Sequence, residues 1–228
     1  MTHPDYGRAF GLFRDAAGPA WTDYTRHAFV QKLGDGTLPR AAFLHYLVQD
    51  YVFLTHFTRG WALAIVKSET LEETRLSASL VQGLVHGEMQ LHVKICADEG
   101  ISEQTLFEAA ESPANLAYTR YVMDAGQAGD LCDLLAALAP CVFGYGEIGL
   151  QLAQTRAADT PYGDWIDTYA GDDYQALCRD VGVMLDGALT RRIGSPLDLA
   201  PRWPRLCKRF STATALEVGF WQMGLDQT

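Results

Sequence analysis

The chain is organised around the stretch LLAALAPCVFGYGEIG, residues 134–149. Apolar residues occur at almost every position of this stretch, a pattern typical of a helix that is buried on all sides. It also holds a proline, a cysteine and, one helical turn after the cysteine, a tyrosine: Pro140, Cys141 and Tyr145. A helix that serves packing alone requires none of these three. The stretch is therefore both the predicted centre of the fold and the first candidate for a functional site.

Helical periodicity continues through nearly all of the remaining sequence, and no stretch alternates like a β-strand. Thr70 and Glu73 have the spacing of a capping box, and Thr37 is expected to cap the helix that follows it. No linker is long or polar enough to mark a domain boundary. The sequence thus predicts one all-α domain, a helical bundle spanning 1–228. Its helices are expected at about 5–16, 20–33, 38–67, 71–98, 102–110, 113–126, 130–157, 165–169, 172–192 and 202–225.

Composition excludes several classes of partner. The formal net charge is −10 and no basic run occurs, so nucleic acid and anionic membranes are not expected partners. The five cysteines are scattered without a Cys-x-x-Cys pair, which indicates neither a disulfide framework nor a zinc site and favours a reducing, cytoplasmic location. The chain does not begin like a secretory signal. The apolar segment 134–153 contains Pro140, glycines and Glu147, so we interpret it as a core helix and not as a membrane span.

Two carboxylates stand where helical spacing predicts apolar residues, and a buried charge is unfavourable without a partner. Glu217 lies in the middle of an apolar face of the last helix. It is either paired with an Arg or Lys of another helix or is a general acid–base group with a raised pKa. Asp50 lies among apolar neighbours of the 38–67 helix. It either accepts a structural hydrogen bond from a helix terminus or a Tyr, or binds the N–H groups of an amino-heterocycle.

A lone cysteine on an apolar helix face is more often an inert core residue than a functional one. The neighbours of Cys141 favour a functional role. Pro140 cannot donate a helical hydrogen bond, so it is expected to kink or loosen the helix beside Cys141. Gly144 and Gly146 are expected to leave room next to the sulfur. We interpret Cys141 as the nucleophile of a small-molecule hydrolase whose carboxylates lie on other helices.

Several segments, in this order, resemble the TenA family, also called thiaminase II or aminopyrimidine aminohydrolases. They are FLHYLVQDY (43–51), AYT (117–119), LAPC (138–141), YGEIG (145–149), WIDTYAG (165–171) and LE (216–217) followed by FW (220–221). The resemblance implies an all-α fold of the haem-oxygenase-like type without haem, assembled as a homotetramer. It also implies thiamin salvage: hydrolysis of 4-amino-5-aminomethyl-2-methylpyrimidine to the 5-hydroxymethyl pyrimidine and ammonia, and in many members cleavage of thiamin into pyrimidine and thiazole.

The resemblance further implies residue roles, with no metal or cofactor among them. Cys141 is the implied nucleophile and Glu217 the implied acid–base group. The implied substrate-binding residues are Asp50, Phe53, Tyr118, Tyr145, Tyr169 and Phe220. Phe53 departs from members that have Tyr there, which affects the expected preference between aminopyrimidine and thiamin. Either Glu217 or the Tyr145 hydroxyl is a candidate to take the proton of Cys141.

Two other hypotheses remain open from the residues. Glu88 and His92 are four residues apart, as in the ligand sets of helical di-iron proteins, so a metal-dependent oxygenase of the same fold is one alternative. Against it, no second Glu-x-x-His pair occurs, and capping or surface hydrogen bonds are the more ordinary explanation of the pair. The other alternative is a non-catalytic pyrimidine-binding or regulatory protein.

Overall fold

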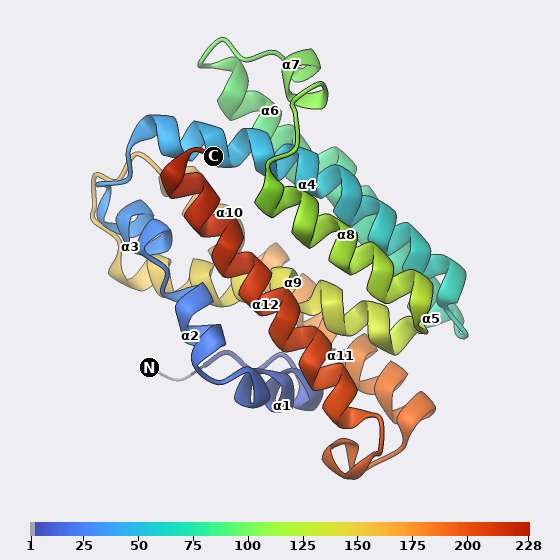
Figure 1. Cartoon of the computed structure of the whole chain (residues 1–228). Helices are drawn as coiled ribbons and strands as arrows, with labels where there is room; N and C mark the ends of the chain where they lie inside the picture. The colour runs from blue at the N-terminus through green and yellow to red at the C-terminus, as the bar shows by residue number, and fades with distance from the viewer. Residues whose placement is uncertain (1–2) are drawn as a thin grey trace.

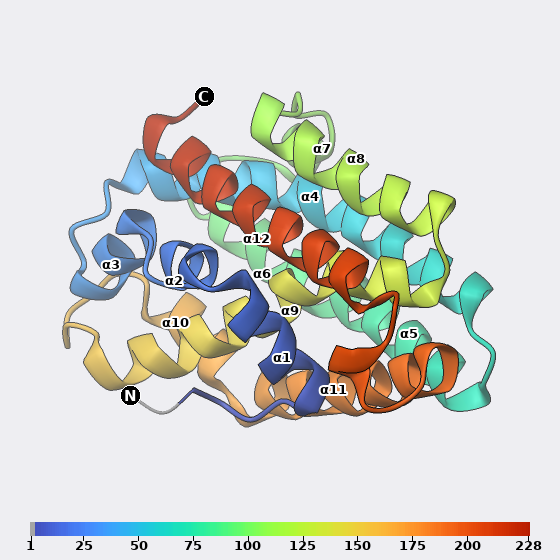
Figure 2. The ribbon, with the colours of Figure 1, turned by 60° about the horizontal axis from the view of Figure 1, so that its bottom comes forward.

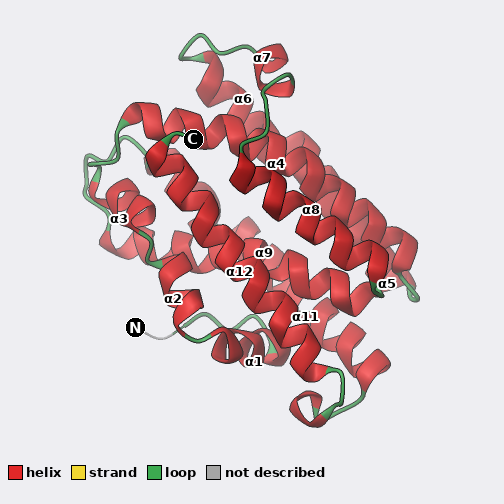
Figure 3. Cartoon of the chain, in the orientation of Figure 1, coloured by secondary structure: helices red, strands yellow, loops and turns green. Residues whose placement is uncertain are grey.

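The computed structural model describes residues 3–228, and every regular element among them is a helix (Figures 1 and 3). The first two residues of the predicted domain lie outside this range. The helices are α1 (Arg8–Ala17), α2 (Pro19–Thr25), α3 (Ala28–Asp35), α4 (Arg40–Lys67), α5 (Leu71–Gly83), the π-turn η1 (Leu84–Glu88), α6 (Met89–Ala97), α7 (Glu103–Phe107), α8 (Pro113–Ala128), α9 (Leu131–Thr155), α10 (Gly163–Ala170), α11 (Asp172–Ile193), the 3₁₀ turn η2 (Leu197–Leu199) and α12 (Trp203–Asp226). The predicted all-α fold is confirmed.

Helix α9, which contains residues 134–149, is the centre of the bundle. Every residue from Leu131 to Gly149 is buried, and α9 packs against α12, α10, α11, α8 and α4. Figure 2 shows α9 with α10 and α11 on one side and α4 and α8 on the other. The helix is long and apolar enough to cross a membrane, but its apolar window is 100% buried in the protein. It is the core helix that the sequence predicts, and it continues through Pro140 without a break.

A charged cluster fixes the beginning of α9 against α12. Asp130 and Asp133 form the capping box of α9, which satisfies the free backbone N–H groups of its first turn. Arg202, which precedes α12, and Arg205 and Arg209 of α12 all reach the buried Asp133 carboxylate, at 2.8, 3.1 and 2.6 Å. The hydrogen-bonded guanidinium groups supply the partners that a buried charge needs. The two helices are thereby held in one register.

Two predicted helix boundaries are wrong. The helix expected at 20–33 is two helices, because the chain breaks at Arg26 and His27, and the His27 ring caps α3 by accepting the N–H of Phe29 at 3.2 Å. Thr37 does not cap α4: its N–H and hydroxyl both bind Asp35, and the helix starts at Arg40. At both places a side chain makes a local hydrogen bond that the helical pattern does not predict. The capping box of Thr70 and Glu73 is confirmed.

The helix expected at 71–98 contains a π-turn that the sequence pattern does not predict. Residues 84–88 form η1 between α5 and α6. A π-turn adds one residue to a helical turn, so it changes which side chains face the core on either side of it. His92 is 0% exposed as a result, although the sequence favours a place on the surface or at a cap. Glu88 ends the same turn.

The expectation that Gly144 and Gly146 leave room beside the sulfur is wrong, because aromatic side chains fill that space. A Cβ atom on Gly144 would overlap the Tyr24 ring, and one on Gly146 would lie 2.7 Å from both the Cys178 sulfur and the Tyr6 hydroxyl. These glycines allow α2 and α11 to pack closely against α9. They shape the wall behind the site and do not open a cavity.

We predict that Gly144→Ala destabilises the protein by about 2–4 kcal/mol, because the Tyr24 ring is fully buried and has no space to move aside. Gly219→Ala is the matched control: Gly219 is a helical glycine of α12, and nothing lies within 4 Å of the position that an added methyl group would take. It is expected to stabilise by up to about 1 kcal/mol through helix propensity. Denaturant unfolding of the two variants measures both effects, and equal stabilities would contradict the close packing described for Gly144.

Candidate active site

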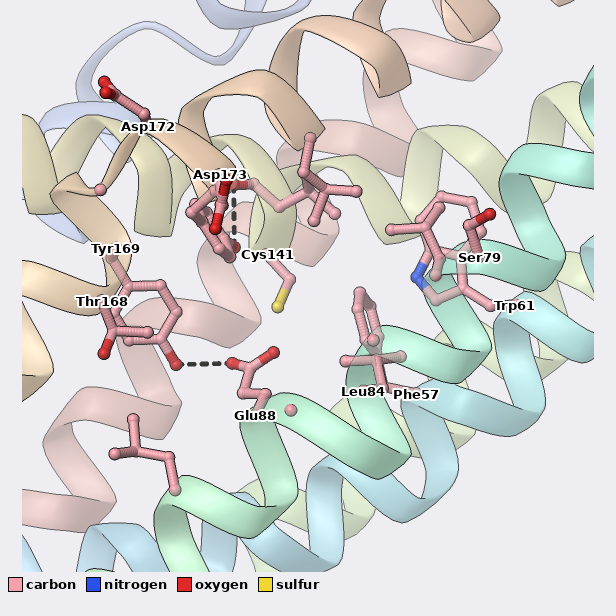
Figure 4. A pocket seen from close by; sticks show the side chains of 18 of the residues that line it. Phe57, Trp61, Ser79, Leu84, Glu88, Cys141, Thr168, Tyr169, Asp172 and Asp173 are labelled. Atoms are coloured by element: carbon pink, nitrogen blue, oxygen red, sulfur yellow. Dashed lines mark hydrogen bonds between the residues drawn. The ribbon is translucent and has the colours of Figure 1, made fainter.

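A large cavity opens beside α9 (Figure 4). Its volume is about 710 Å³, which suits a small organic molecule. Side chains of α4, the α5–η1–α6 segment, α9, α10 and the start of α11 line it. The lining residues that bear on its chemistry and shape are Phe57, Trp61, Leu84, Glu88, Cys141 and Tyr169. Of the predicted site residues, Cys141 and Tyr169 therefore border the cavity directly.

The sulfur of Cys141 points into this cavity, and Glu88 lies across from it (Figure 4). Burial raises the pKa of the Cys141 thiol well above its ordinary value, and the negative charges of Glu217, Glu88 and Asp50 raise it further. No Lys, Arg or His is among the described residues that line the cavity. The thiol is therefore neutral at rest, so a nucleophilic attack must transfer its proton to a nearby base.

Glu217 is 1% exposed and receives a hydrogen bond of 2.8 Å from the Tyr118 hydroxyl. Burial raises its pKa to about 8, even though Tyr118 and the nearby Tyr24 hydroxyl act in the opposite direction. The contacts found for Glu217 in residues 3–228 are thus with hydroxyl groups, and no Arg or Lys ion pair to it is found there. This favours the acid–base interpretation over the structural one, because the proton can leave or return near neutral pH.

Asp50 and His92 form a buried pair that sequence reasoning did not connect. The His92 Nε2 atom lies 2.7 Å from Asp50 Oδ2, and the Tyr46 hydroxyl donates to the same oxygen at 3.0 Å. The other ring nitrogen, Nδ1, lies 2.8 Å from the Glu88 backbone carbonyl, so it must carry a proton. Burial lowers the pKa of His92, but the hydrogen bond and charge of Asp50 outweigh burial and raise it overall. The charged form of His92, which donates from both ring nitrogens, is thereby favoured.

The structural alternative for Asp50, a hydrogen bond from a Tyr, is correct in part, since Tyr46 donates to it. Both bonds use Oδ2, however. The second carboxylate oxygen accepts neither of them. Asp50 therefore has a fixed orientation, and one of its oxygens is engaged by neither His92 nor Tyr46.

Glu88 lines the cavity, a place that the sequence does not predict, because its pattern suggests only an iron ligand or a capping or surface hydrogen bond. The Tyr169 hydroxyl donates to Glu88 Oε1 at 2.5 Å. Burial raises the pKa of Glu88 to about 7, and the charge of Asp50 adds to the rise, while Tyr169 and His92 lower it. Its spacing from His92 was the available signal. The hydrophobic periodicity of the sequence does not indicate the π-turn that places Glu88 at the cavity.

The hydrogen bonds of His92 argue against the metal site that Glu88 and His92 suggest in the sequence. Both nitrogens of His92 are engaged, one by the Glu88 carbonyl and one by Asp50. Across residues 3–228, no three His, Cys, Asp or Glu side chains are grouped so that they could hold a metal ion. The pair Glu88 and His92 is explained by these hydrogen bonds instead.

The other predicted residues form one connected cluster next to the cavity. Phe53 contacts the rings of Tyr118 and Phe220, with centroids 4.9 and 5.5 Å apart, and stacks on Phe57 of the cavity wall. Phe220 in turn contacts the ring of Tyr46, which binds Asp50. This network joins the Glu217 side of the cluster to the Asp50 side.

Tyr145 lies on the Asp50 side of the cluster. Its ring contacts Tyr169, and its hydroxyl lies 3.3 Å from that of Tyr46. Burial and the charge of Asp50 raise the pKa of Tyr145 well above its ordinary value, so this phenol stays neutral. Of the two candidate bases for Cys141, Glu217 is therefore the better one.

We predict that Glu217→Gln stabilises the protein more at pH 8 than at pH 5. The folded-state pKa of Glu217, about 8, exceeds the ordinary value of 4.5, so folding keeps a proton that the unfolded chain releases above pH 4.5. Stability from this group is therefore fully present below pH 4.5 and is lost as the pH rises toward 8. The expected gain at pH 8 is on the order of 2–4 kcal/mol, measured by denaturant unfolding at both pH values. A pH-independent difference between variant and wild type would contradict the raised pKa.

Comparison with known proteins gives relatives along nearly the whole chain. A crystal structure from Silicibacter sp. TM1040, described as a TenA family transcription regulator, is 63% identical and superimposes with a TM-score of 0.94, covering 96% of this chain and 97% of that one. The aminopyrimidine aminohydrolase of Halalkalibacterium halodurans is 33% identical over 93% of each chain. A domain of unknown function from Shewanella denitrificans, described as having a heme oxygenase-like fold, matches with a TM-score of 0.70 at 14% identity and covers 98% and 94% of the two chains.

The last of these matches concerns the fold alone and confirms the haem-oxygenase-like architecture expected from the sequence. The model of the TENA/THI-4/PQQC family matches residues 14–227, which includes every residue of the candidate site. The chain belongs to the TENA/THI-4/PQQC family.

Proposed function

We propose that this protein is a hydrolase of thiamin salvage that acts as an aminopyrimidine aminohydrolase. Its substrate would be 4-amino-5-aminomethyl-2-methylpyrimidine, converted to the 5-hydroxymethyl pyrimidine and ammonia, and it would also cleave thiamin into pyrimidine and thiazole. The relative from Halalkalibacterium halodurans carries the name of this activity. The observation that carries the proposal is the thiol of Cys141 in a cavity whose nearby carboxyls, Glu217 and Glu88, have pKa values of about 8 and 7.

Cys141 would supply covalent catalysis. The C–N bond from the methylene to its amino group is hard to break directly, because the aromatic ring does not help to expel the amine. When the sulfur adds to a ring carbon, an S–C bond forms and the displaced electron pair moves onto the ring nitrogens. That pair then expels the amine, breaking the C–N bond and leaving an exocyclic methylene. Water adds to the methylene, the S–C bond breaks and the aromatic ring is restored.

Glu217 would manage the protons of these steps. Its ionised form accepts the proton of the Cys141 thiol during attack, and its protonated form donates to the departing amine. Later it accepts a proton from the attacking water. A group with a pKa of about 8 can serve in both states near neutral pH. Tyr118, bound to the Glu217 carboxylate at 2.8 Å, would hold it in position.

Asp50 would bind the pyrimidine. One carboxylate oxygen is held by His92 and Tyr46. The other would accept a hydrogen bond from the 4-amino group of the ring. Aromatic side chains of Tyr145, Tyr169 and Phe220 would pack around the ring, and Phe53, which lacks a hydroxyl, would set the preference between the two substrates. Such positioning contributes several kcal/mol to typical barrier reductions.

The assembly and location follow from the same family resemblance. We propose a single domain that forms a homotetramer in the cytoplasm, acts without metal or cofactor and uses neither nucleic acid nor membrane as a partner. Large apolar side chains are exposed in the single chain, including Val66, Phe107, Val183 and Leu199 at 70% or more of their surface. They are available for contacts between subunits.

We predict that Cys141→Ala lowers ammonia release from the aminopyrimidine by a factor of about 10³ or more while the protein stays folded, because the variant has no nucleophile. Cys207→Ala is the control: this cysteine is partly exposed on α12 and should be dispensable. Ammonia release is followed for both variants, with the helical circular dichroism as a check of folding.

Near-normal turnover by Cys141→Ala would rule out the covalent mechanism. If the wild type binds the hydroxymethyl pyrimidine but converts neither the aminopyrimidine nor thiamin, the protein is instead a non-catalytic pyrimidine-binding or regulatory protein. The description of the 63% identical relative as a transcription regulator makes this arm of the experiment necessary.

A further inference from the structure

The mechanism proposed above assigns no step to the carboxyl of Glu88, which lines the cavity. Glu88 lies across the cavity from the Cys141 sulfur (Figure 4). Its Oε1 atom receives the Tyr169 hydroxyl at 2.5 Å. The second carboxylate oxygen lies on the side of the sulfur in Figure 4, away from Tyr169. A group bound to Cys141 would therefore meet an oxygen that Tyr169 does not occupy.

The π-turn ties Glu88 to the predicted pyrimidine-binding residue. His92 bonds the backbone carbonyl of Glu88 through Nδ1 and the carboxylate of Asp50 through Nε2. The ring is fully buried, so both bonds are held in one geometry. Glu88 consequently keeps a fixed position relative to Asp50.

The charge of the cavity has one sign. The described residues that line it include four carboxylates, those of Glu88, Asp167, Asp172 and Asp173, and no Lys, Arg or His. Asp167 is neutralised by Arg156 at 2.7 Å. Asp172 and Asp173 are exposed and stand in the first turn of α11. Such a cavity attracts cations and repels anions.

We propose that Glu88 is a specificity-determining residue that binds the positively charged group on the exocyclic methylene of the substrate, and that the cavity excludes pyrimidines whose methylene carries a phosphate ester. This inference rests on the function proposed above. An aminomethyl group is an ammonium ion at neutral pH, and the thiazole of thiamin is a cation when attached to the methylene. The hydroxymethyl product is neutral, so it loses this contact after the reaction.

The contact would also assist the reaction. An amine leaves readily only in its protonated form, and a carboxylate beside it favours that form. The C–N bond then breaks with its electron pair on nitrogen, and the released ammonia takes the proton of Glu217 and departs as ammonium. The pKa of Glu88, about 7, leaves the free carboxyl partly protonated at neutral pH, and a bound cation would favour its ionised form.

Binding of three pyrimidines by calorimetry tests the proposal. They carry aminomethyl, hydroxymethyl or hydroxymethyl-phosphate substituents and are otherwise identical. The Cys141→Ala protein prevents turnover during titration. In this background the aminomethyl compound should bind most tightly and the phosphate ester least. A phosphate ester that binds as tightly as the alcohol would overturn the proposal without any change at Glu88.

Glu88→Gln, added to the same background, keeps an acceptor for Tyr169 and removes the charge. It should weaken binding of the aminomethyl compound by about tenfold to a hundredfold and change binding of the alcohol by less than about threefold. Asp172→Asn is the control. It also removes one carboxylate from the cavity lining, but the Asp172 side chain points away from the Cys141 sulfur in Figure 4. It should change either affinity by less than about threefold, as a distant screened charge does.

Three results would overturn the role of Glu88: no change in either affinity, an equal change in both, or an equal effect of Asp172→Asn. If Glu88→Gln does not fold, Glu88→Asp tests the same contact, since it retains the charge but shortens the side chain by one methylene. It should weaken binding of the aminomethyl compound and leave binding of the alcohol unchanged. Failure of the proposed function is recognised separately, because the wild type would then release no ammonia and cleave no thiamin. Absence of any pyrimidine binding would overturn both.

Discussion

The arrangement of the site depends on the two hydrogen bonds of His92. The ring lies between α6 and α4, with Nδ1 on the Glu88 carbonyl and Nε2 on the Asp50 carboxylate. A buried carboxylate without such a partner would be neutralised or would destabilise the fold. His92 is the hydrogen-bond partner of the buried Asp50 carboxyl, and the π-turn allows His92 to reach it. The same turn places the Glu88 side chain in the cavity, so one local irregularity of a helix arranges three ionisable groups.

The reactive thiol lies in surroundings that oppose its ionisation. Burial and three neighbouring carboxyls raise the pKa of Cys141, and no cation lines the described part of the cavity. This differs from sites that store a thiolate beside a His or Lys. A neutral thiol is protected from random oxidation and reacts only when a substrate and a base are both in place. The aromatic cluster around Phe53, Phe220 and Tyr46 keeps water away from the charged groups and thereby maintains their shifted pKa values.

Most of the fold and half of the electrostatics of the site could be predicted from the sequence. The long helices are recognisable by periodicity and caps, and Asp50 and Glu217 stand out because each is a charge on an apolar face. The π-turn could not be predicted, because inserting one residue into a turn alters the facing of α6 without altering its composition. The sequence pattern consequently gives His92 and Glu88 no part in the leading hypothesis. The expectation for the glycines at 144 and 146 fails for a related reason. The space that a glycine leaves on one helix is filled by side chains of other elements, and the sequence of α9 does not tell which side chains these are.

Three buried or half-buried glutamates show how the partner decides the role of a carboxyl. Burial alone would raise the pKa of Glu73, yet the hydrogen bonds of Arg192 and Arg191 bring it down to about 2. That carboxylate is charged at every physiological pH and joins α5 to α11. Glu217 and Glu88 have hydroxyl partners in place of guanidinium groups, and their pKa values are about 8 and 7. A hydroxyl satisfies the hydrogen bond without supplying charge, so burial prevails and the proton becomes exchangeable near neutral pH. The same residue type therefore serves as a structural anion where arginines reach it and as a proton carrier where only tyrosines do.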